Sequence, residues 1–195
     1  MNFFKKLFKR NKPPKEEIIN PPNVNLSLEH VFVNNFIAKG GKFLYCISEN
    51  EIINNLTKII SENNWNTITC FDNNIEIFLK KSDVNIQKEL DIKKPFFTTC
   101  EHLISDNGDI LFSSNQLSNH KISSLTEDFI VFAKTSQFVK DRGEGLTGIK
   151  TNYKEIIPTN ISAIRKYSFL NDDDNFLNYG DNNSKNLYLL LLEDL

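Results

Sequence analysis

The stretch HLISDNGDILFSS, residues 102–114, places an acidic, glycine-containing centre between two apolar runs. Asp106 could accept a hydrogen bond from a ligand hydroxyl, and Gly108 would let a ligand approach the backbone closely. Asn107 followed by Gly108 is also a strong signal for a two-residue hairpin turn, because both residues tolerate a positive φ. The segment therefore predicts a β-hairpin, and it leaves open whether the turn also lines a ligand site.

Histidine and cysteine residues offer no metal-binding pattern. The three histidines are far apart in the sequence, and the three cysteines include no closely spaced pair. Cys100 and His102 would share one face of a strand, as a thiolate–imidazole pair requires, but no oxyanion element accompanies them. We therefore predict no metal site, and we expect Cys46, Cys70 and Cys100 to be reduced and buried.

Residues 143–148 spell a GxGxxG pattern, which in dinucleotide-binding proteins directly follows a strand and opens a helix. Here the preceding strand is expected to end near Lys134, which is too early for that motif. We interpret the glycines as the loose end of a helix that starts at 135 and ends or bends near Arg142. The acidic run at 172–174 lacks the spacing of a Ca²⁺ loop, so it predicts a solvated loop.

The elements that must position these residues follow an α/β order. A helix after Ser27 leads to apolar strands at 42–48 and 67–71, and an amphipathic helix capped by Ser48 and Glu51 separates the two strands. A strand, a helix and a strand at this spacing form a βαβ unit with a right-handed crossover. The two strands are therefore expected to be parallel.

The second half of the chain continues this pattern. One long strand is expected over 95–105, followed by the hairpin, a strand at 128–134 and a final buried strand from 186. The sequence therefore predicts an α/β fold, with a mostly parallel sheet, helices on both faces and one inserted hairpin.

Composition limits the class of protein. The net charge is −2 and the pI is near 6.0, which argues against nucleic acid as a partner. No apolar stretch approaches the ~20 residues of a transmembrane helix, and no signal-peptide pattern opens the sequence. We therefore expect a cytoplasmic protein.

Two regions are expected, namely 1–25 and the α/β domain at 26–195. The first begins with a short helix that has phenylalanines on one face and lysines on the other, and a proline-rich linker follows it. Two helical turns are too short for firm membrane binding alone, so we favour packing against the domain. Weak contact with a membrane surface, or docking to a partner, stays open as the alternative.

The order of motifs from about residue 96 to the C-terminus resembles the LUD family, the lactate-utilisation proteins of the LutC/YkgG type. Residues 105–109 stand where the family has A-E-T-G-T, and they keep the acid and the glycine. Residues 157–162, I-P-T-N-I-S, correspond to the family's L-P-S-N-I-T. The chain is therefore similar to a divergent member of this family.

The resemblance weakens after this point. The family continues with S-G-P-S-R-T-A-D-I, whereas residues 165–173 match only at Ser168 and Asp172 and lack the Gly-Pro and the arginine. The later G-x-H-G-P segment keeps only its first glycine, Gly180. Arg165 and Lys166 lie nearby and could replace the lost positive charge.

The resemblance implies a fold similar to the NagB/RpiA/CoA-transferase group and a role in the oxidation of L-lactate to pyruvate. Two other components act in that reaction, and they carry iron–sulfur clusters or resemble cluster-binding proteins. Three cysteines cannot hold a four-cysteine cluster, so no cofactor is expected on this chain and electrons must pass through a partner.

A small carboxylate ligand would bind at the carboxyl ends of the strands, where the hairpin and the loop after Ile164 are expected. The candidate substrate-binding residues are Asp106, Asn107, Gly108, Ser113, Ser114, Arg165, Ser168 and Asp172. Three functions stay open. The first is an accessory subunit of lactate oxidation without its own redox centre. The second is a non-catalytic ligand-binding or scaffold protein with a degenerate site. The third is a transferase or isomerase that uses Glu101 or Asp106 as its acid.

Overall fold

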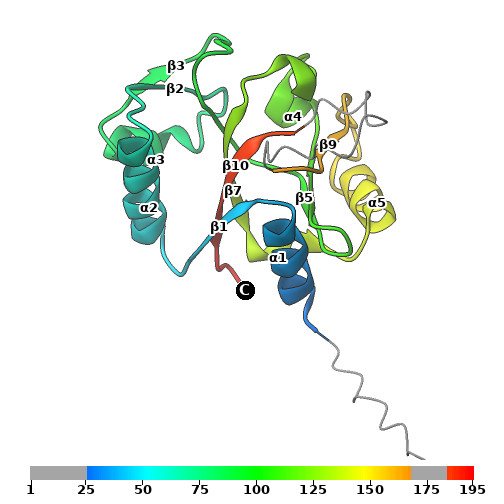
Figure 1. The fold of residues 1–195 in the computed structure, drawn as a ribbon. Coiled ribbons are helices and arrows are strands. Elements are labelled where there is room, and N and C mark those ends of the chain that lie inside the picture. Colours follow the sequence, from blue (N-terminus) through cyan, green and yellow to red (C-terminus); the bar gives the residue numbers. More distant parts are fainter. Residues whose placement is uncertain (1–25, 168–183) are drawn as a thin grey trace, which may run out of the picture.

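The computed structural model describes residues 26–167 and 184–195, and it contains two β-sheets (Figure 1). The larger sheet has six parallel strands in the order β1-β10-β7-β4-β2-β3. Its strands are β1 (Lys42–Cys46), β2 (Thr67–Thr69), β3 (Asn85–Gln87), β4 (Phe96–Thr98), β7 (Asp128–Lys134) and β10 (Asn186–Leu192). The basic helix and linker expected at 1–25, and Ser168, Asp172 and the acidic run at 172–174, lie outside the described residues.

The smaller sheet contains the predicted hairpin. Its four strands follow the order β8-β5-β6-β9. They are β5 (His102–Ile104), β6 (Asp109–Phe112), β8 (Phe138–Val139) and β9 (Ser162–Ile164). The antiparallel pairing of β5 with β6 confirms the hairpin that Asn107-Gly108 predicted.

Helices cover both faces of the larger sheet, as the sequence predicted. The helices are α1 (Leu28–Ala38), α2 (Glu49–Glu62), α3 (Glu76–Lys81), α4 (Ser114–Leu117) and α5 (Arg142–Asn152). One face packs against α2 and α3, and the other packs against α1 and the smaller sheet (Figure 1). In the described part of the chain, no helix has the length and apolar character needed to cross a membrane.

Alternating burial along the central strands builds two cores. In β7, Phe129 and Val131 face α1 and the hairpin, whereas Ile130 and Phe132 face α2 and α3. The residues of α2 that meet this second core are Ile52, Leu56, Ile59 and Ile60. They recur at helical spacing, so the apolar residues that predicted α2 form the face that this helix buries.

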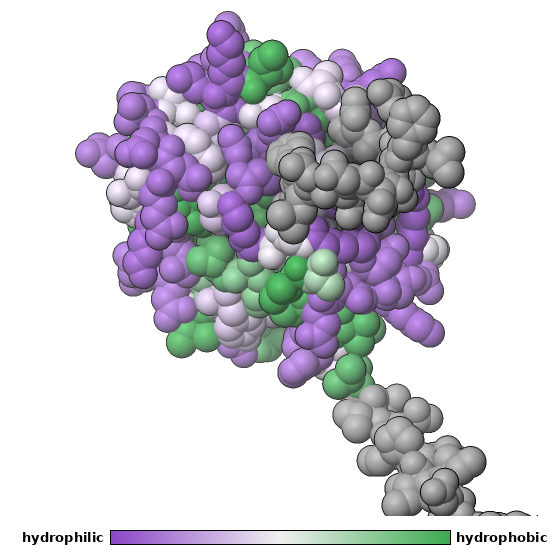
Figure 2. Space-filling view, in the orientation of Figure 1, coloured by the Kyte–Doolittle hydropathy of each residue, from purple (hydrophilic) through white to green (hydrophobic). Residues whose placement is uncertain are grey.

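Strand β1 lies at one edge of the larger sheet, beside α1. Apolar surface gathers in the lower half of the view, where these two elements lie (Figure 2). The exposed apolar side chains in and beside these two elements include Leu26, Leu28, Ile37, Tyr45 and Ile47. The sheet therefore ends at this edge on an apolar surface.

The prediction of one long strand over 95–105 is wrong, because the chain passes from one sheet to the other within this segment. Strand β4 ends at Thr98 in the larger sheet, and β5 begins at His102 in the smaller one. The Glu101 N–H donates to the Leu111 carbonyl at 2.8 Å, so the hairpin pairing starts at this break. No glycine or proline marks the change, which explains why the sequence did not reveal it.

The helix expected from 135 to near Arg142 is also wrong. A 3₁₀ turn (Thr135–Gln137) and β8 occupy that segment, and α5 begins where the expected helix ended. The Asp141 side chain accepts from the Glu144 N–H at 2.9 Å, and the Glu144 carboxylate accepts from the Lys140 N–H at 2.6 Å. This reciprocal cap starts α5, so the GxGxxG residues lie inside a helix.

Candidate functional site

A cavity of about 450 Å³ opens where β4 and β7 end, at the carboxyl edge of the larger sheet. Polar side chains line much of it, among them Thr99, Glu101, His102, Lys134, Gln137 and Tyr153. Ligands of open α/β sheets bind at this edge, because loops from neighbouring strands converge there. We therefore take this cavity, named here the Glu101 cavity, as the candidate functional site.

Glu101 is the buried acid of the site, with 8% of its surface exposed. Its Oε1 accepts from the Ser113 hydroxyl at 2.6 Å, from Asn115 Nδ2 at 3.0 Å and from Gln116 Nε2 at 3.1 Å. Its Oε2 accepts from the Tyr153 hydroxyl at 3.2 Å. Four donors therefore hold the carboxylate in one position.

Three of these donors belong to the short helix α4. Ser113 caps this helix, since its hydroxyl accepts from the Asn115 N–H at 3.1 Å. Its own N–H donates to the Gln116 carboxamide oxygen at 2.9 Å, which completes a capping box. The local sequence therefore builds α4 so that its side chains point back at Glu101.

The loop after β7 closes another side of the cavity. Gln137 Nε2 donates to the Cys100 carbonyl at 2.6 Å, and Gln137 Oε1 accepts from the Lys134 N–H at 2.8 Å. These bonds tie the carboxyl ends of β4 and β7 together. The Lys134 ammonium is therefore carried on a fixed backbone at the rim of the cavity.

His102 has an unusual position beside Glu101. Its Nδ1 is buried and has no hydrogen-bond partner among the described residues. Helix α5 passes close to the ring, because a Cβ placed on Gly148 would lie 2.8 Å from His102 Nε2. Nδ1 of His102 is therefore a polar side-chain atom that the described fold leaves buried and unsatisfied, which carries a cost in stability.

Two further groups have raised pKa values. Burial raises the pKa of the Tyr153 hydroxyl, and the charge of Glu101 adds to the shift. Burial also raises the pKa of the Cys100 thiol, with a smaller contribution from Glu101. Cys100 is therefore held as a thiol, which does not suit a nucleophilic pair with His102. The site can offer an acceptor, a cation, an imidazole and a phenol.

The predicted turn residues lie elsewhere and contact the chain itself. Gly108 has a φ of 70°, and a Cβ there would lie 2.6 Å from the Phe36 nitrogen. Asn35 Nδ2 donates to the carbonyls of Ser105 and Asp106 at 3.0 and 3.1 Å. The close approach that Gly108 permits is therefore made by α1.

Charged groups gather at the same end of the hairpin. Asp109 is buried, and its Oδ1 pairs with Lys39 Nζ at 2.9 Å. Its Oδ2 lies 3.7 Å from Arg165 Nε. Tyr167 donates its hydroxyl to the Gly108 carbonyl at 2.5 Å. The turn is therefore fixed to α1 and to the segment after β9.

The structure divides the candidate residues between the two ends of the hairpin. Ser113 is fully buried and reaches the Glu101 cavity only through its bond to Glu101. Asp106, Asn107 and Gly108 lie at the opposite end of the hairpin, on the side of Arg165. Ser114 Oγ accepts from the Thr159 N–H at 3.0 Å, so it anchors the segment before β9. Sequence reasoning missed Asn115, Gln116 and Tyr153, although the Ser113–Gln116 capping box was a readable signal. Their role at the site depends on contacts with Glu101 across the fold.

Metal ligation has little basis in the described ranges. Within 26–167 and 184–195 no group of three or more histidine, cysteine or acidic side chains could hold a metal ion. The three cysteines of the sequence are free and buried in the structure.

Comparisons with known proteins give one informative result. No family model matches the sequence, and no curated protein matches it. A crystal structure of a DUF162 family protein from Deinococcus radiodurans is similar in fold, with a TM-score of 0.60 at 14% sequence identity. The similarity covers 86% of this chain and 96% of that one.

DUF162 is the LUD domain family, so the structural neighbour comes from the family that the sequence motifs resemble. At this low identity the similarity concerns the fold. The chain is therefore an α/β protein with the fold of a DUF162 family protein, as the sequence predicted.

Proposed function

We propose that this chain binds a small 2-hydroxy acid in the Glu101 cavity and acts as an accessory subunit in the oxidation of L-lactate to pyruvate. The observation that carries the proposal is the buried Glu101 carboxylate, held by four donors where two parallel strands end. The resemblance to LUD-family motifs supplies the reaction. A cytoplasmic location, expected from the sequence, is part of the same proposal.

The residues of the cavity suit the two polar ends of such a ligand. The Lys134 ammonium would bind the ligand carboxylate as a charge-assisted pair. Glu101 would accept a hydrogen bond from the 2-hydroxyl, and the His102 ring would border the same ligand. These contacts bind and orient the ligand.

Oxidation of lactate removes two electrons and two protons from C2 and its hydroxyl. The sequence has three cysteines, one fewer than a cluster with four thiolate ligands requires. The electrons would therefore pass to iron–sulfur partner proteins, and this chain would contribute binding and orientation without a redox centre of its own.

Deletion of the gene tests this role directly. We expect the deletion to slow growth on L-lactate, with growth restored by the wild-type gene and by Lys58→Met, an exposed change on α2. Glu101→Gln should fail to restore growth. Unchanged growth and lactate consumption after the deletion would contradict the proposal.

One observation favours a second candidate, a non-catalytic ligand-binding or scaffold protein. Four side chains of the chain itself donate to the Glu101 carboxylate, as in a structural network. A thermal-shift screen with lactate, pyruvate, sugar phosphates and coenzyme A separates a ligand-binding chain from a scaffold. A ligand at 100 times its Kd should stabilise the fold by about 2.7 kcal/mol, whereas a scaffold should show no shift.

A further inference from the structure

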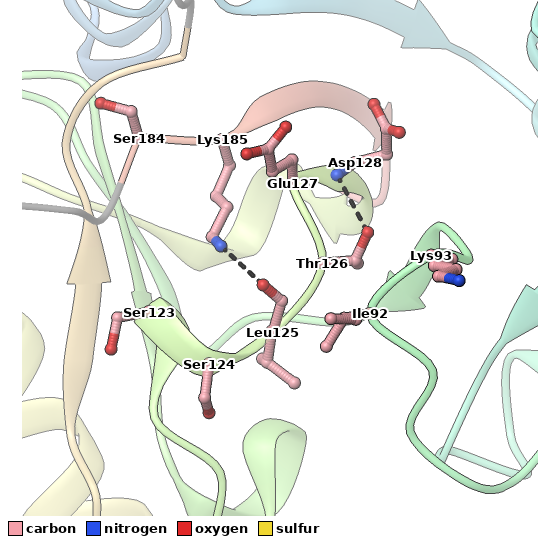
Figure 3. A pocket seen from close by; sticks show the side chains of 10 residues that line it. All are labelled: Ile92, Lys93, Ser123, Ser124, Leu125, Thr126, Glu127, Asp128, Ser184 and Lys185. Carbon is pink, nitrogen blue, oxygen red and sulfur yellow. Dashed lines mark hydrogen bonds between the residues drawn. The ribbon is translucent and has the colours of Figure 1, made fainter.

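A second cavity, of about 760 Å³, lies at the amino ends of the strands of the larger sheet, where β7 and β10 begin. The Glu101 cavity lies at their carboxyl ends. Residues of three separate segments line it, among them Lys93, Ser123, Thr126, Asp128 and Lys185 (Figure 3). None of these residues lines the Glu101 cavity. A ligand here would therefore occupy a different site.

Lys185 is the unusual residue of this cavity, because only 3% of its surface is exposed. Its ammonium donates to the Leu125 carbonyl at 3.0 Å (Figure 3). It also lies 5.5 Å from the centre of the Phe129 ring. Among the described residues it forms no salt bridge. An ammonium has three donors, and the described residues give this one a single hydrogen-bond acceptor, while the nearby Glu127 carboxylate acts on it through its charge without a salt bridge.

The backbone imposes this burial. The Lys185 N–H donates to the Lys166 carbonyl at 3.1 Å, and the Asn186 N–H donates to the Glu127 carbonyl at 2.9 Å. These bonds fix Lys185 at the start of β10, so its side chain runs inward against Phe129. Burial lowers the pKa of the Lys185 ammonium, and the charge of Glu127 offsets part of that shift.

We propose that this cavity is a second binding site, in which Lys185 binds the carboxylate of a small molecule. Hydroxyls of Ser123, Ser124 and Thr126 border the cavity and can donate to the same ligand. Glu127 and Asp128 lie on its rim, and their charges oppose a doubly charged phosphate more strongly than a carboxylate. The same two acids suit a ligand whose other end carries hydrogen-bond donors.

The test follows the side-chain signal of Lys185 by NMR in protein labelled at the lysine ε-carbon. The probes are sodium acetate, sodium phosphate and methylammonium chloride at equal ionic strength, and Lys185→Met assigns the signal. We expect acetate to shift the Lys185 signal saturably and to raise its pKa, with phosphate weaker and methylammonium inactive. The exposed Lys150→Met is the matched control and should leave the response unchanged.

No response of Lys185 to acetate, or an equal response to methylammonium chloride, would overturn the proposal. A stronger response to phosphate would overturn the carboxylate assignment. Glu101→Gln should keep the acetate response, so a failure of this proposal is distinguishable from a failure of the proposed function. If Lys185→Met does not fold, Lys185→Arg keeps the positive charge and assigns the signal in its place.

Discussion

The Ser113 hydroxyl donates to Glu101 Oε1 over 2.6 Å, and this bond ties the end of β4 to the helix that follows the hairpin. Both residues are buried. Asn115 and Gln116 donate to the same oxygen, so one carboxylate satisfies three side chains of a single helical turn. The candidate site and the local fold therefore depend on the same residue.

Replacing Glu101 should show this dependence. We expect Glu101→Ala to lower the free energy of unfolding by about 2–3 kcal/mol, because it leaves buried donors without an acceptor. Glu101→Gln keeps an acceptor oxygen and should lower the free energy of unfolding by about 1 kcal/mol. Urea denaturation measures both values, and an alanine variant as stable as the wild type would contradict the network.

Gly148 should tolerate no side chain, because α5 passes directly over His102. A Cβ at Gly148 would meet His102 Nε2 at 2.8 Å, so we expect Gly148→Ala to destabilise the fold by about 1–3 kcal/mol. Gly143→Ala is the matched control. Its Cβ would meet only the Asp141 side chain at 3.2 Å, and alanine favours the helix by up to about 1 kcal/mol. Equal effects of the two changes, measured by thermal denaturation, would contradict the close packing of α5.

Gly108 should be the most sensitive position of the hairpin turn. Alanine there would combine a positive φ with a Cβ 2.6 Å from the Phe36 backbone, so we expect a loss above about 2 kcal/mol. The neighbouring Asp106 side chain is exposed, and Asp106→Ala should change stability by less than about 0.5 kcal/mol. If the two variants are equally stable in urea, the turn does not pack on α1 as described.

Asp106→Ala also tests the binding role that the sequence suggested for the turn. Asp106 lies at the far end of the hairpin from Glu101, so we expect lactate binding to survive this change. Calorimetric titration measures the affinity. Loss of binding would place the ligand at the turn, beside Asn107, Gly108 and Arg165.

The three thiols should react slowly with a thiol reagent in the folded protein. Burial raises the pKa of Cys46 and raises that of Cys70 to about 11, and it raises the pKa of Cys100 further. Because the thiolate is the reactive form, we expect reaction at pH 7 only after unfolding. Rapid reaction of one thiol in the native protein, followed by absorbance, would contradict the burial of that cysteine.

Local signals in the sequence predicted most of the elements. Ser48 and Glu51 predicted the start of α2, where the Glu51 N–H lies 3.4 Å from Ser48 Oγ. Asn107-Gly108 predicted the hairpin from turn chemistry alone. Each of these features depends on residues within a few positions of one another.

Features that depend on distant residues escaped the sequence. Glu101 and Tyr153 meet across 52 positions, and no spacing rule connects them. The three glycines of α5 predicted a loose helix end, because their helix propensity is poor. Packing against β5 overrides that propensity at Gly148, which is why α5 continues through the motif.

Calorimetric titration of L-lactate into wild-type protein, Glu101→Gln and Lys134→Met tests the central claim most directly, with Lys150→Met as the control. We expect the wild type and the control to bind alike, and the two cavity variants to bind at least about tenfold more weakly, which corresponds to about 1.4 kcal/mol. The same affinity in all four proteins, or no binding by the wild type, would contradict the assignment of the Glu101 cavity as the ligand site.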